Sequence, residues 1–265
     1  PWRNQLPTVI QNGASNGVPL AKSKYGSGNL STYEEAIRTL RNSILLTDFD
    51  RHLKTMLVTS ASPSEGKSTI AIHLAVAHAQ QHHRTLIIDG DLRRPSVHKR
   101  LNIPNTHGLS DILLSGESWR NAIQTPPGIP DLDIIPAGSA NPRRAADQLG
   151  KRLEQILDEV ASEYDLIIVD APPLLGFPEP LQMAACVDGV VVVARAGQTS
   201  RRAVGSVLAT LNRLRANTIG LILNEVTRDI SHSYYYYGYY KRYYTEPLES
   251  PASSSNDSFK DRSNS

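Results

Sequence analysis

The chain has 265 residues, with 28 Lys or Arg against 26 Asp or Glu, and one cysteine, Cys186. A net charge of +2 is too small to indicate a nucleic-acid-binding protein. One cysteine excludes a disulfide framework and any site that needs two cysteines from one chain, and it favours the reducing cytoplasm. The longest apolar run, VDGVVVVARA, has the length of a strand and not of a membrane span.

Residues 1–30 are rich in Pro, Gly, Asn and Ser without periodic apolar positions, which predicts a flexible linker cut from something longer upstream. A single domain is expected over residues 31–230, where apolar runs of strand length alternate with segments of helical period. This alternation is typical of a doubly wound α/β fold with a mostly parallel sheet flanked by helices. Ligands of such sheets bind at the carboxyl ends of the strands.

The expected elements follow one another in a regular order. Strands are expected at 55–61, 84–90, 132–137, 165–170, 189–194 and 218–224. Helices are expected at 31–47, 66–82, 142–162 and 199–215, with shorter ones near 108–115 and 178–186. Several strand runs are apolar at nearly every position, as expected where helices cover both faces of the sheet.

The first expected helix contains the sequence E-A-I-R-T-L-R. Glu35, Arg38 and Arg41 therefore follow one another at three-residue spacing and share roughly one face. A solvated face with an internal Glu35–Arg38 pair is one interpretation. That pair leaves Arg41 beside another cation, which favours an external anionic partner and hence an oligomer.

The first expected strand leads into ASPSEGKST, residues 61–69, which opens a helix. Gly66, Lys67 and Ser68 fit the phosphate-loop pattern of P-loop NTPases, with Ala61 at its first glycine position. Backbone N–H groups and the helix N-terminus would surround a triphosphate, Lys67 would reach the β- and γ-phosphates, and Ser68 would offer its hydroxyl to Mg²⁺. We expect ATP and Mg²⁺ as ligands, with an ATP site formed by Ala61, Ser62, Pro63, Ser64, Glu65, Gly66, Lys67, Ser68 and Thr69.

Two further strands end in carboxylates. Asp89 ends the second strand, in LIIDGDLRRP, and Asp170 ends the fourth, in LIIVDAPP. A buried carboxylate requires a cation partner, and Mg²⁺ prefers one or two carboxylates with phosphate oxygens. We therefore expect Asp89 and Asp170, with Ser68, to hold the metal; capping of the following turn is the alternative for each.

Asp91 lies two residues beyond Asp89, within the loop, where it is free to orient an incoming hydroxyl group. Phosphoryl transfer depends more on positioning and charge neutralisation than on a strong base, so we expect one oriented carboxylate to suffice. The expected catalytic residues are Lys67, Asp89, Asp91 and Asp170. Arg93 and Arg94 either neutralise phosphate charge or are surface charges, and the sequence favours neither.

Residues 231–265 are expected to be a disordered, tyrosine-rich tail. The stretch SHSYYYYGYYKRYY, residues 231–244, holds eight of the 11 tyrosines of the chain, and a Ser/Pro/charge mixture follows it. The cluster is either an adhesive aromatic tract or a set of phosphoacceptors. The candidate acceptors are Tyr234, Tyr235, Tyr236, Tyr237, Tyr239, Tyr240, Tyr243 and Tyr244.

Together, the three motifs and the tyrosine cluster make residues 31–244 resemble the bacterial tyrosine kinases, the cytoplasmic autokinase modules of capsular and exopolysaccharide assembly systems. The resemblance implies an ATP-dependent protein-tyrosine kinase that phosphorylates its C-terminal tyrosines between subunits and so regulates polysaccharide polymerisation or export. It assigns Glu35, Arg38 and Arg41 to the closure of a ring of subunits. It also implies a transmembrane polysaccharide co-polymerase as activator, fused upstream or separate, a cognate tyrosine phosphatase, and a position at the inner face of the plasma membrane.

The chain departs from that family at Ser64, where glycine is usual. A Cβ atom restricts positive φ angles, so the loop would be strained, or ATP would bind less well, if this position requires such a conformation. The septum-positioning and plasmid-partition ATPases are wider relatives, but they carry a lysine at the position of Ser62 and lack the tyrosine cluster. The position of Asn224 lies near adenine in them, which makes Asn224 an ATP-binding candidate, or simply a turn asparagine.

Two other functions are compatible with the sequence. The first is an ATPase switch of the partition type, which hydrolyses ATP without phosphorylating tyrosine. The second is a nucleotide-binding regulator that stabilises a membrane export protein without catalysis. The tyrosine cluster separates the kinase from both, because only a kinase should lose self-modification when these tyrosines become Phe.

Overall fold

The computed structural model describes residues 8–9, 32–46 and 53–226, all within one compact unit that extends to Thr227. The strands are β1 Thr8–Val9, β2 Thr55–Ser60, β3 Thr85–Asp89, β4 Leu132–Ile135, β5 Leu166–Asp170, β6 Gly189–Arg195 and β7 Thr218–Asn224. The helices are α1 Thr32–Leu46, α2 Lys67–Ala79, α3 Val97–Leu101, α4 Leu109–Ser115, α5 Pro142–Asp147, α6 Leu149–Val160, α7 Glu179–Ala185 and α8 Arg201–Arg213, with the 3₁₀ helix η2 Trp119–Ala122.

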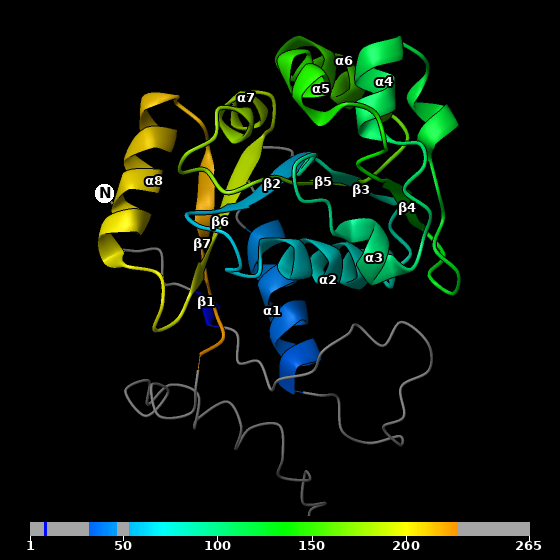
Figure 1. Cartoon of the computed structure of the whole chain (residues 1–265). Helices are drawn as coiled ribbons and strands as arrows, with labels where there is room; N and C mark the ends of the chain where they lie inside the picture. Colours follow the sequence, from blue (N-terminus) through cyan, green and yellow to red (C-terminus); the bar gives the residue numbers. More distant parts are fainter. Residues whose placement is uncertain (1–7, 10–31, 47–52, 227–265) are drawn as a thin grey trace, which may run out of the picture. The chain divides into compact units, whose positions relative to one another are not determined.

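The strands form one sheet in the order β1-β7-β6-β2-β5-β3-β4, and all neighbouring strands are parallel. Figure 1 shows α1, α2 and α3 on one side of the sheet and α4, α5, α6 and α7 on the other. The doubly wound α/β fold expected from the sequence is therefore confirmed.

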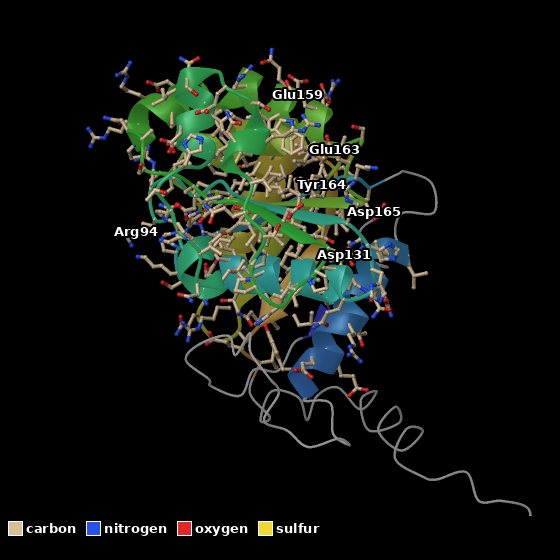
Figure 2. The ribbon with its side chains drawn as sticks, turned by 90° about the vertical axis from the view of Figure 1, so that its right-hand side faces the viewer. Arg94, Asp131, Glu159, Glu163, Tyr164 and Asp165 are labelled. Carbon is tan, nitrogen blue, oxygen red and sulfur yellow. The ribbon has the colours of Figure 1, made fainter. Side chains whose placement is uncertain are left out.

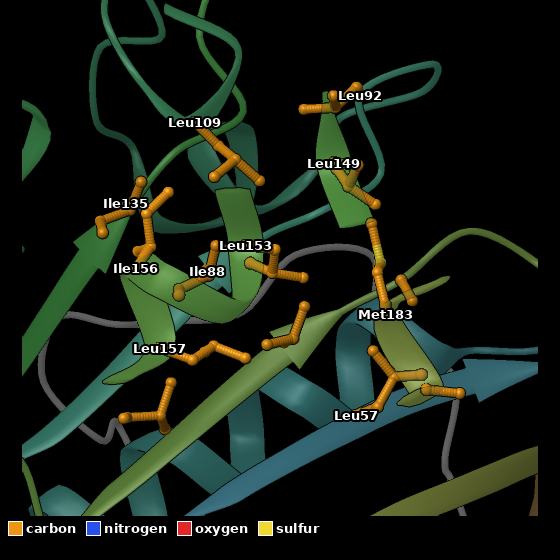
Figure 3. Close-up of a cluster of buried hydrophobic side chains, with 14 of the residues drawn as sticks. Leu57, Ile88, Leu92, Leu109, Ile135, Leu149, Leu153, Ile156, Leu157 and Met183 are labelled. Atoms are coloured by element: carbon orange, nitrogen blue, oxygen red, sulfur yellow. The ribbon is translucent and has the colours of Figure 1, made fainter. Parts of the chain in front are cut away.

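Alternate residues of each central strand enter opposite cores because successive side chains of a strand point to opposite faces. In β2, Leu57 packs with the helices α4 to α8, whereas Met56 and Val58 pack with α1, α2 and α3. Figure 3 shows the first of these cores, in which Leu57 and Ile88 of the sheet lie beneath Leu153 of α6 and Met183 of α7. Burial on both faces explains why these strands are apolar at nearly every position.

Helix α6 shows why its segment is helical. Its apolar side chains recur at the helical period and are all buried, whereas the acidic positions between them are exposed. The buried residues are Leu149, Leu153, Ile156, Leu157 and Val160.

The structure differs from the expected elements at three places. The helix expected at 142–162 is two helices, since α5 ends at Gln148, whose N–H bonds back to Ala145 and Ala146, and α6 starts at the next residue. The short helices α3 and η2 were not expected, because five or fewer residues carry no helical period. Two residues of the expected linker, Thr8–Val9, form β1 beside β7.

The order of the strands brings three carboxyl ends together. β2 lies between β6 and β5, and β5 pairs with β3 so that Asp89 is directly opposite Asp170. Val58 of β2 is also opposite Asp170. The segments that follow β2, β3 and β5 therefore share one edge of the sheet. In the part of the chain that the structure describes, no helix is long and apolar enough to cross a membrane.

Candidate active site

The loop between β2 and α2 has two residues in the left-handed region. Gly66 has φ 97°, and a Cβ atom there would lie 2.0 Å from Nδ2 of Asn224, so this position requires glycine for both conformation and space. Ser64 has φ 65°. The conformation that we expected to be costly for a serine at this position is therefore present.

Within this loop, the buried side chain of Glu65 forms hydrogen bonds that hold the loop in place. Its Oε2 accepts the N–H of Ser62 at 2.9 Å, and its Oε1 accepts the hydroxyl of Thr199 at 2.5 Å. The Asn224 amide donates to the carbonyl oxygen of Glu65 at 3.1 Å. The side chain of Asn224 thus holds the backbone of the phosphate loop, and its expected contact with adenine stays a prediction.

Lys67 is the centre of a buried charge cluster at the start of α2. Its Nζ lies 2.9 Å from Oδ2 of Asp91, 3.8 Å from Oδ1 of Asp170 and 3.2 Å from the hydroxyl oxygen of Ser68. All four residues are less than a tenth exposed. The fold therefore gathers these predicted site residues around one ammonium group.

Burial controls the protonation of this cluster. Desolvation raises the pKa of Asp170 to about 6, although the Lys67 ammonium and the Ser68 hydroxyl oppose the increase. Desolvation and the neighbouring charge of Asp170 raise the pKa of Asp89 to about 8. Desolvation lowers the pKa of Lys67, but the three aspartates outweigh it and the net pKa is raised. The site therefore keeps Lys67 charged and has more carboxylate than one lysine can neutralise.

Asp89 accepts backbone N–H groups with both oxygens. Its Oδ1 accepts from Asp91 at 3.2 Å, and its Oδ2 accepts from Ser96 and Val97 at 3.1 Å each. These contacts are those of the turn-capping alternative. Asp91 is oriented in turn by the N–H of Arg94, which donates to its Oδ1 at 3.0 Å. The loop after β3 thus fixes both carboxylates without using a side-chain cation for Asp89.

The two arginines after Asp91 have different surroundings. Arg93 donates to the buried Glu179 at the start of α7, with its Nη2 2.6 Å from Oε1, and its guanidinium lies over the ring of Phe177. Arg94 is exposed, and Figure 2 places it at the opposite end of the molecule from Asp165, which precedes β5. Both arginines are exposed, but Arg93 is held against the start of α7 by its ion pair with Glu179. Glu179 is a neighbour of the site that the sequence analysis missed.

The donor set suits Mg²⁺ held together with phosphate. Neither carboxylate oxygen of the fully buried Asp170 accepts a hydrogen bond of ordinary geometry from the described residues. Within those residues, no group of three or more His, Cys, Asp and Glu is placed to hold a metal ion. Mg²⁺ binds proteins through few carboxylates and completes its shell with water and phosphate oxygens, so the unsatisfied oxygens of Asp170 fit such a site.

The other predicted residues lie away from this cluster. Glu35 and Arg38 are exposed on α1. Arg41 donates to the carbonyl oxygen of Ala77, near the end of α2, at 2.8 Å, so it has a partner within the fold; an external anionic partner for it stays a prediction. The tyrosines at 234–244 lie outside the described residues.

A parallel sheet with a phosphate loop at one strand end and aspartates at two others defines a P-loop nucleotide-binding protein. The family of AAA domains matches residues 54–224. The chain is 34% identical, over 78% of its length and 87% of the relative, to tyrosine-protein kinase YwqD of Bacillus subtilis strain 168. It therefore belongs to the family of bacterial tyrosine kinases and is a phosphotransferase, as the resemblance implied.

Two further comparisons agree. The kinase domain of the Escherichia coli tyrosine kinase ETK has a similar structure, with a TM-score of 0.74 and 27% identity over 83% of this chain and 90% of that chain. Tyrosine-protein kinase wzc of Salmonella typhimurium strain LT2 is 31% identical over 79% of this chain. The match covers only 29% of that relative, which carries additional sequence.

Proposed function

We propose that the chain transfers the γ-phosphoryl group of ATP to its own tyrosines at 234–244, between subunits of an oligomer. The observation that carries this proposal is the buried contact of Lys67 with Asp91 and Asp170 beside the phosphate loop, in a chain whose last strand is followed, ten residues later, by eight clustered tyrosines. One polypeptide then contains charged groups suited to binding phosphates and hydroxyl groups that can accept a phosphoryl group.

Lys67 has to exchange partners when ATP binds. Its ammonium bonds to Asp91 and Asp170, and the γ- and β-phosphates are competing anions beside the N-terminus of α2. The residues that would hold Mg²⁺ are Ser68, Asp89 and Asp170. The ion would neutralise charge on the phosphate oxygens. Asp170 would lose Lys67 as a neighbour, and a bound Mg²⁺ would supply positive charge in its place.

Asp91 is the residue placed to receive the acceptor. The N–H of Arg94 holds its Oδ1, whereas its Oδ2 is released when Lys67 turns to the phosphates. Oδ2 then accepts the proton of a tyrosine hydroxyl while the phenolic oxygen bonds to the γ-phosphorus. The bond from that phosphorus to the oxygen of ADP breaks, and ADP leaves with its electron pair.

The described tyrosines are poor acceptors. The Tyr164 hydroxyl donates to Asp133 at 2.9 Å, and the Tyr33 hydroxyl bonds to His73. Burial raises the pKa of both phenols. These contacts support the assignment of phosphorylation to the C-terminal cluster.

Regulation of polysaccharide polymerisation or export is the role that we propose for this reaction. A transmembrane co-polymerase, fused upstream or separate, would hold the kinase at the inner face of the plasma membrane and activate it, and a tyrosine phosphatase would reset the tail. Glu35 and Arg38, exposed on α1, would contact the next subunit of a ring.

The first experiment is to incubate the purified chain with ATP and Mg²⁺ and to map modified residues by mass spectrometry. We expect phosphate on tyrosines within 234–244 and none on Tyr33 or Tyr164. Lys67→Met should abolish it. Turnover of ATP without modified tyrosine, in the presence of the activator segment, would instead support an ATPase switch.

Transfer between subunits is tested by mixing two variants. One carries Lys67→Met with its tyrosines intact, and the other is active but has all eight tail tyrosines changed to Phe. Phosphate on the Lys67→Met chain shows transfer between chains. Its absence, when the wild-type chain alone is modified, would mean that each subunit phosphorylates its own tail.

A further inference from the structure

The ends of β6 and β7 lie directly beside the phosphate loop. Arg195, the last residue of β6, is opposite Asn224, the last residue of β7, and the N–H of Ala196 donates to the Asn224 carbonyl oxygen at 2.8 Å. Asn224 packs against Gly66, and Thr199 bonds to Glu65. The phosphate loop therefore rests on the two strands that precede the tyrosine-bearing segment.

Arg195 connects the loop to the residue after β7. Its Nη1 lies 3.5 Å from the carbonyl oxygen of Ser64, and its Nη2 forms an ion pair with Glu225. Ser64 and Glu225 both have positive φ, at 65° and 56°. Such a conformation is unfavourable for a residue other than glycine, and it persists only where its surroundings hold it. One guanidinium thus joins the backbone of Ser64 to the side chain of Glu225, and both residues have positive φ.

The position of Glu225 links this contact to the tyrosine-bearing segment. It follows the last strand and stands nine residues before Tyr234. A movement of the Ser64 carbonyl when phosphate fills the loop would move the guanidinium, and the guanidinium would move Glu225.

We propose that Arg195 is a positioning residue that couples the binding of ATP in the phosphate loop to the conformation of the chain leaving β7, and so to presentation of the tyrosines. The tyrosine part of this proposal rests on the proposed function; the coupling itself does not. Both members of the Arg195–Glu225 pair are about one third exposed, so the pair adds little to stability and its removal leaves the fold intact.

The coupling is measured by amide hydrogen exchange of residues 225–233, with and without Mg²⁺ and the non-hydrolysable analogue AMP-PNP. In the wild type we expect the analogue to change the exchange rate by at least about fivefold, the lower range of coupling between two sites. Arg195→Ala should remove that change in exchange rate, and it should change the Kd of the analogue by less than about fivefold. Arg202→Ala, an equal loss of charge at the exposed start of α8, should retain it.

Exchanging the charges of Arg195 and Glu225 distinguishes a role of their ion pair from a general structural effect of substitution. Arg195→Glu alone should lose the coupling, and Arg195→Glu with Glu225→Arg should regain part of it. Tail phosphorylation should follow the same order in kcat, with little change in the KM for ATP. No exchange response in the wild type, or an undiminished response in Arg195→Ala, would overturn the proposal. A normal response in a chain whose tail is never phosphorylated would refute the proposed function and leave the coupling standing.

Discussion

Asp89 and Asp170 are fully buried carboxyl groups, and burial makes their charged forms unfavourable in the folded chain. A carboxyl group with a higher pKa in the folded than in the unfolded chain binds more protons when folded, so stability falls as pH rises between the two values. For Asp170 this window runs from about 4, the unfolded value, to about 6 in the folded chain. For Asp89 it extends to about 8.

Asp170→Asn should therefore stabilise the protein without nucleotide. Over pH 4 to 8, we expect the free energy of unfolding to be higher by about 1–3 kcal/mol at pH 8, since one pKa unit corresponds to about 1.4 kcal/mol, and its fall between about pH 4 and 6 to become shallower. Tyrosine phosphorylation should be lost. Urea unfolding across this pH range is the measurement. Asp158→Asn, an exposed position on α6, should bring no gain, and a loss of stability in Asp170→Asn would contradict the assignment.

Ser64 provides a second test at the same scale. A left-handed conformation costs serine about 1–2 kcal/mol, and the greater freedom of glycine in the unfolded chain returns about 0.5–1 kcal/mol of this. Ser64→Gly should therefore raise the free energy of unfolding by up to about 1 kcal/mol. Ser64→Ala keeps the Cβ atom and should bring no gain. If Ser64→Gly were less stable in urea than Ser64→Ala, the strain at this residue would be smaller than the entropy cost of glycine.

At the scale of elements, the contact of α1 with α2 shows that the residues of the E-A-I-R-T-L-R motif differ: Arg41 contacts α2, whereas Glu35 and Arg38 are exposed. Arg41 donates to the Ala77 carbonyl oxygen, and its stem lines a small apolar crevice beneath α1. The other lining residues are Ile44, Leu45, Met56, Leu74 and Leu166. A cation near a helix C-terminus is favourable, so Arg41 holds α1 on α2 whether or not subunits assemble.

Arg41→Ala should consequently lower the free energy of unfolding by about 1 kcal/mol, because it removes a hydrogen bond and a packed stem. Arg38→Ala, on the exposed face of the same helix, should change it by less than about 0.5 kcal/mol. Chemical denaturation at low protein concentration, where subunits are separate, is the measurement. Equal effects of the two substitutions would remove the distinction.

At the scale of the whole molecule, assembly is best tested by substituting exposed residues, because their loss has little effect on the stability of the fold. Glu35→Lys with Arg38→Glu reverses two exposed charges on α1 and leaves Arg41 in place. We expect a smaller assembly mass by light scattering at unchanged stability, with the activator segment present. An unchanged mass would exclude these residues from the subunit contact.

Phosphorylation should itself oppose assembly. Each phosphotyrosine adds about two negative charges, so a fully modified cluster of eight would repel neighbouring tails. We expect the unmodified protein to assemble and the phosphorylated protein to dissociate, with a stronger effect at low ionic strength. A fully phosphorylated sample that remains assembled would contradict this cycle.

The strands and the motif residues were predictable because both are local properties of the sequence. Apolar runs of strand length predicted every strand from β2 to β7, and β7 has the expected bounds. The phosphate loop was predictable because its glycine, lysine and serine stand at fixed spacing before a helix. The break at Gln148 was not, since neither proline nor glycine occupies that position and the helical period continues across it.

The sequence by itself determined the alternation of elements, the phosphate loop, the carboxylates at the strand ends and the family. Only the tertiary structure decided that Lys67 contacts Asp91, 24 residues away, and that Thr199 supports Glu65, 134 residues away. It also decided that Arg41 bonds within the fold and that Arg195 joins Ser64 to Glu225. Periodicity and motif spacing report contacts along one element, whereas these contacts depend on which strands lie side by side, and that order is set by the packing of the whole sheet.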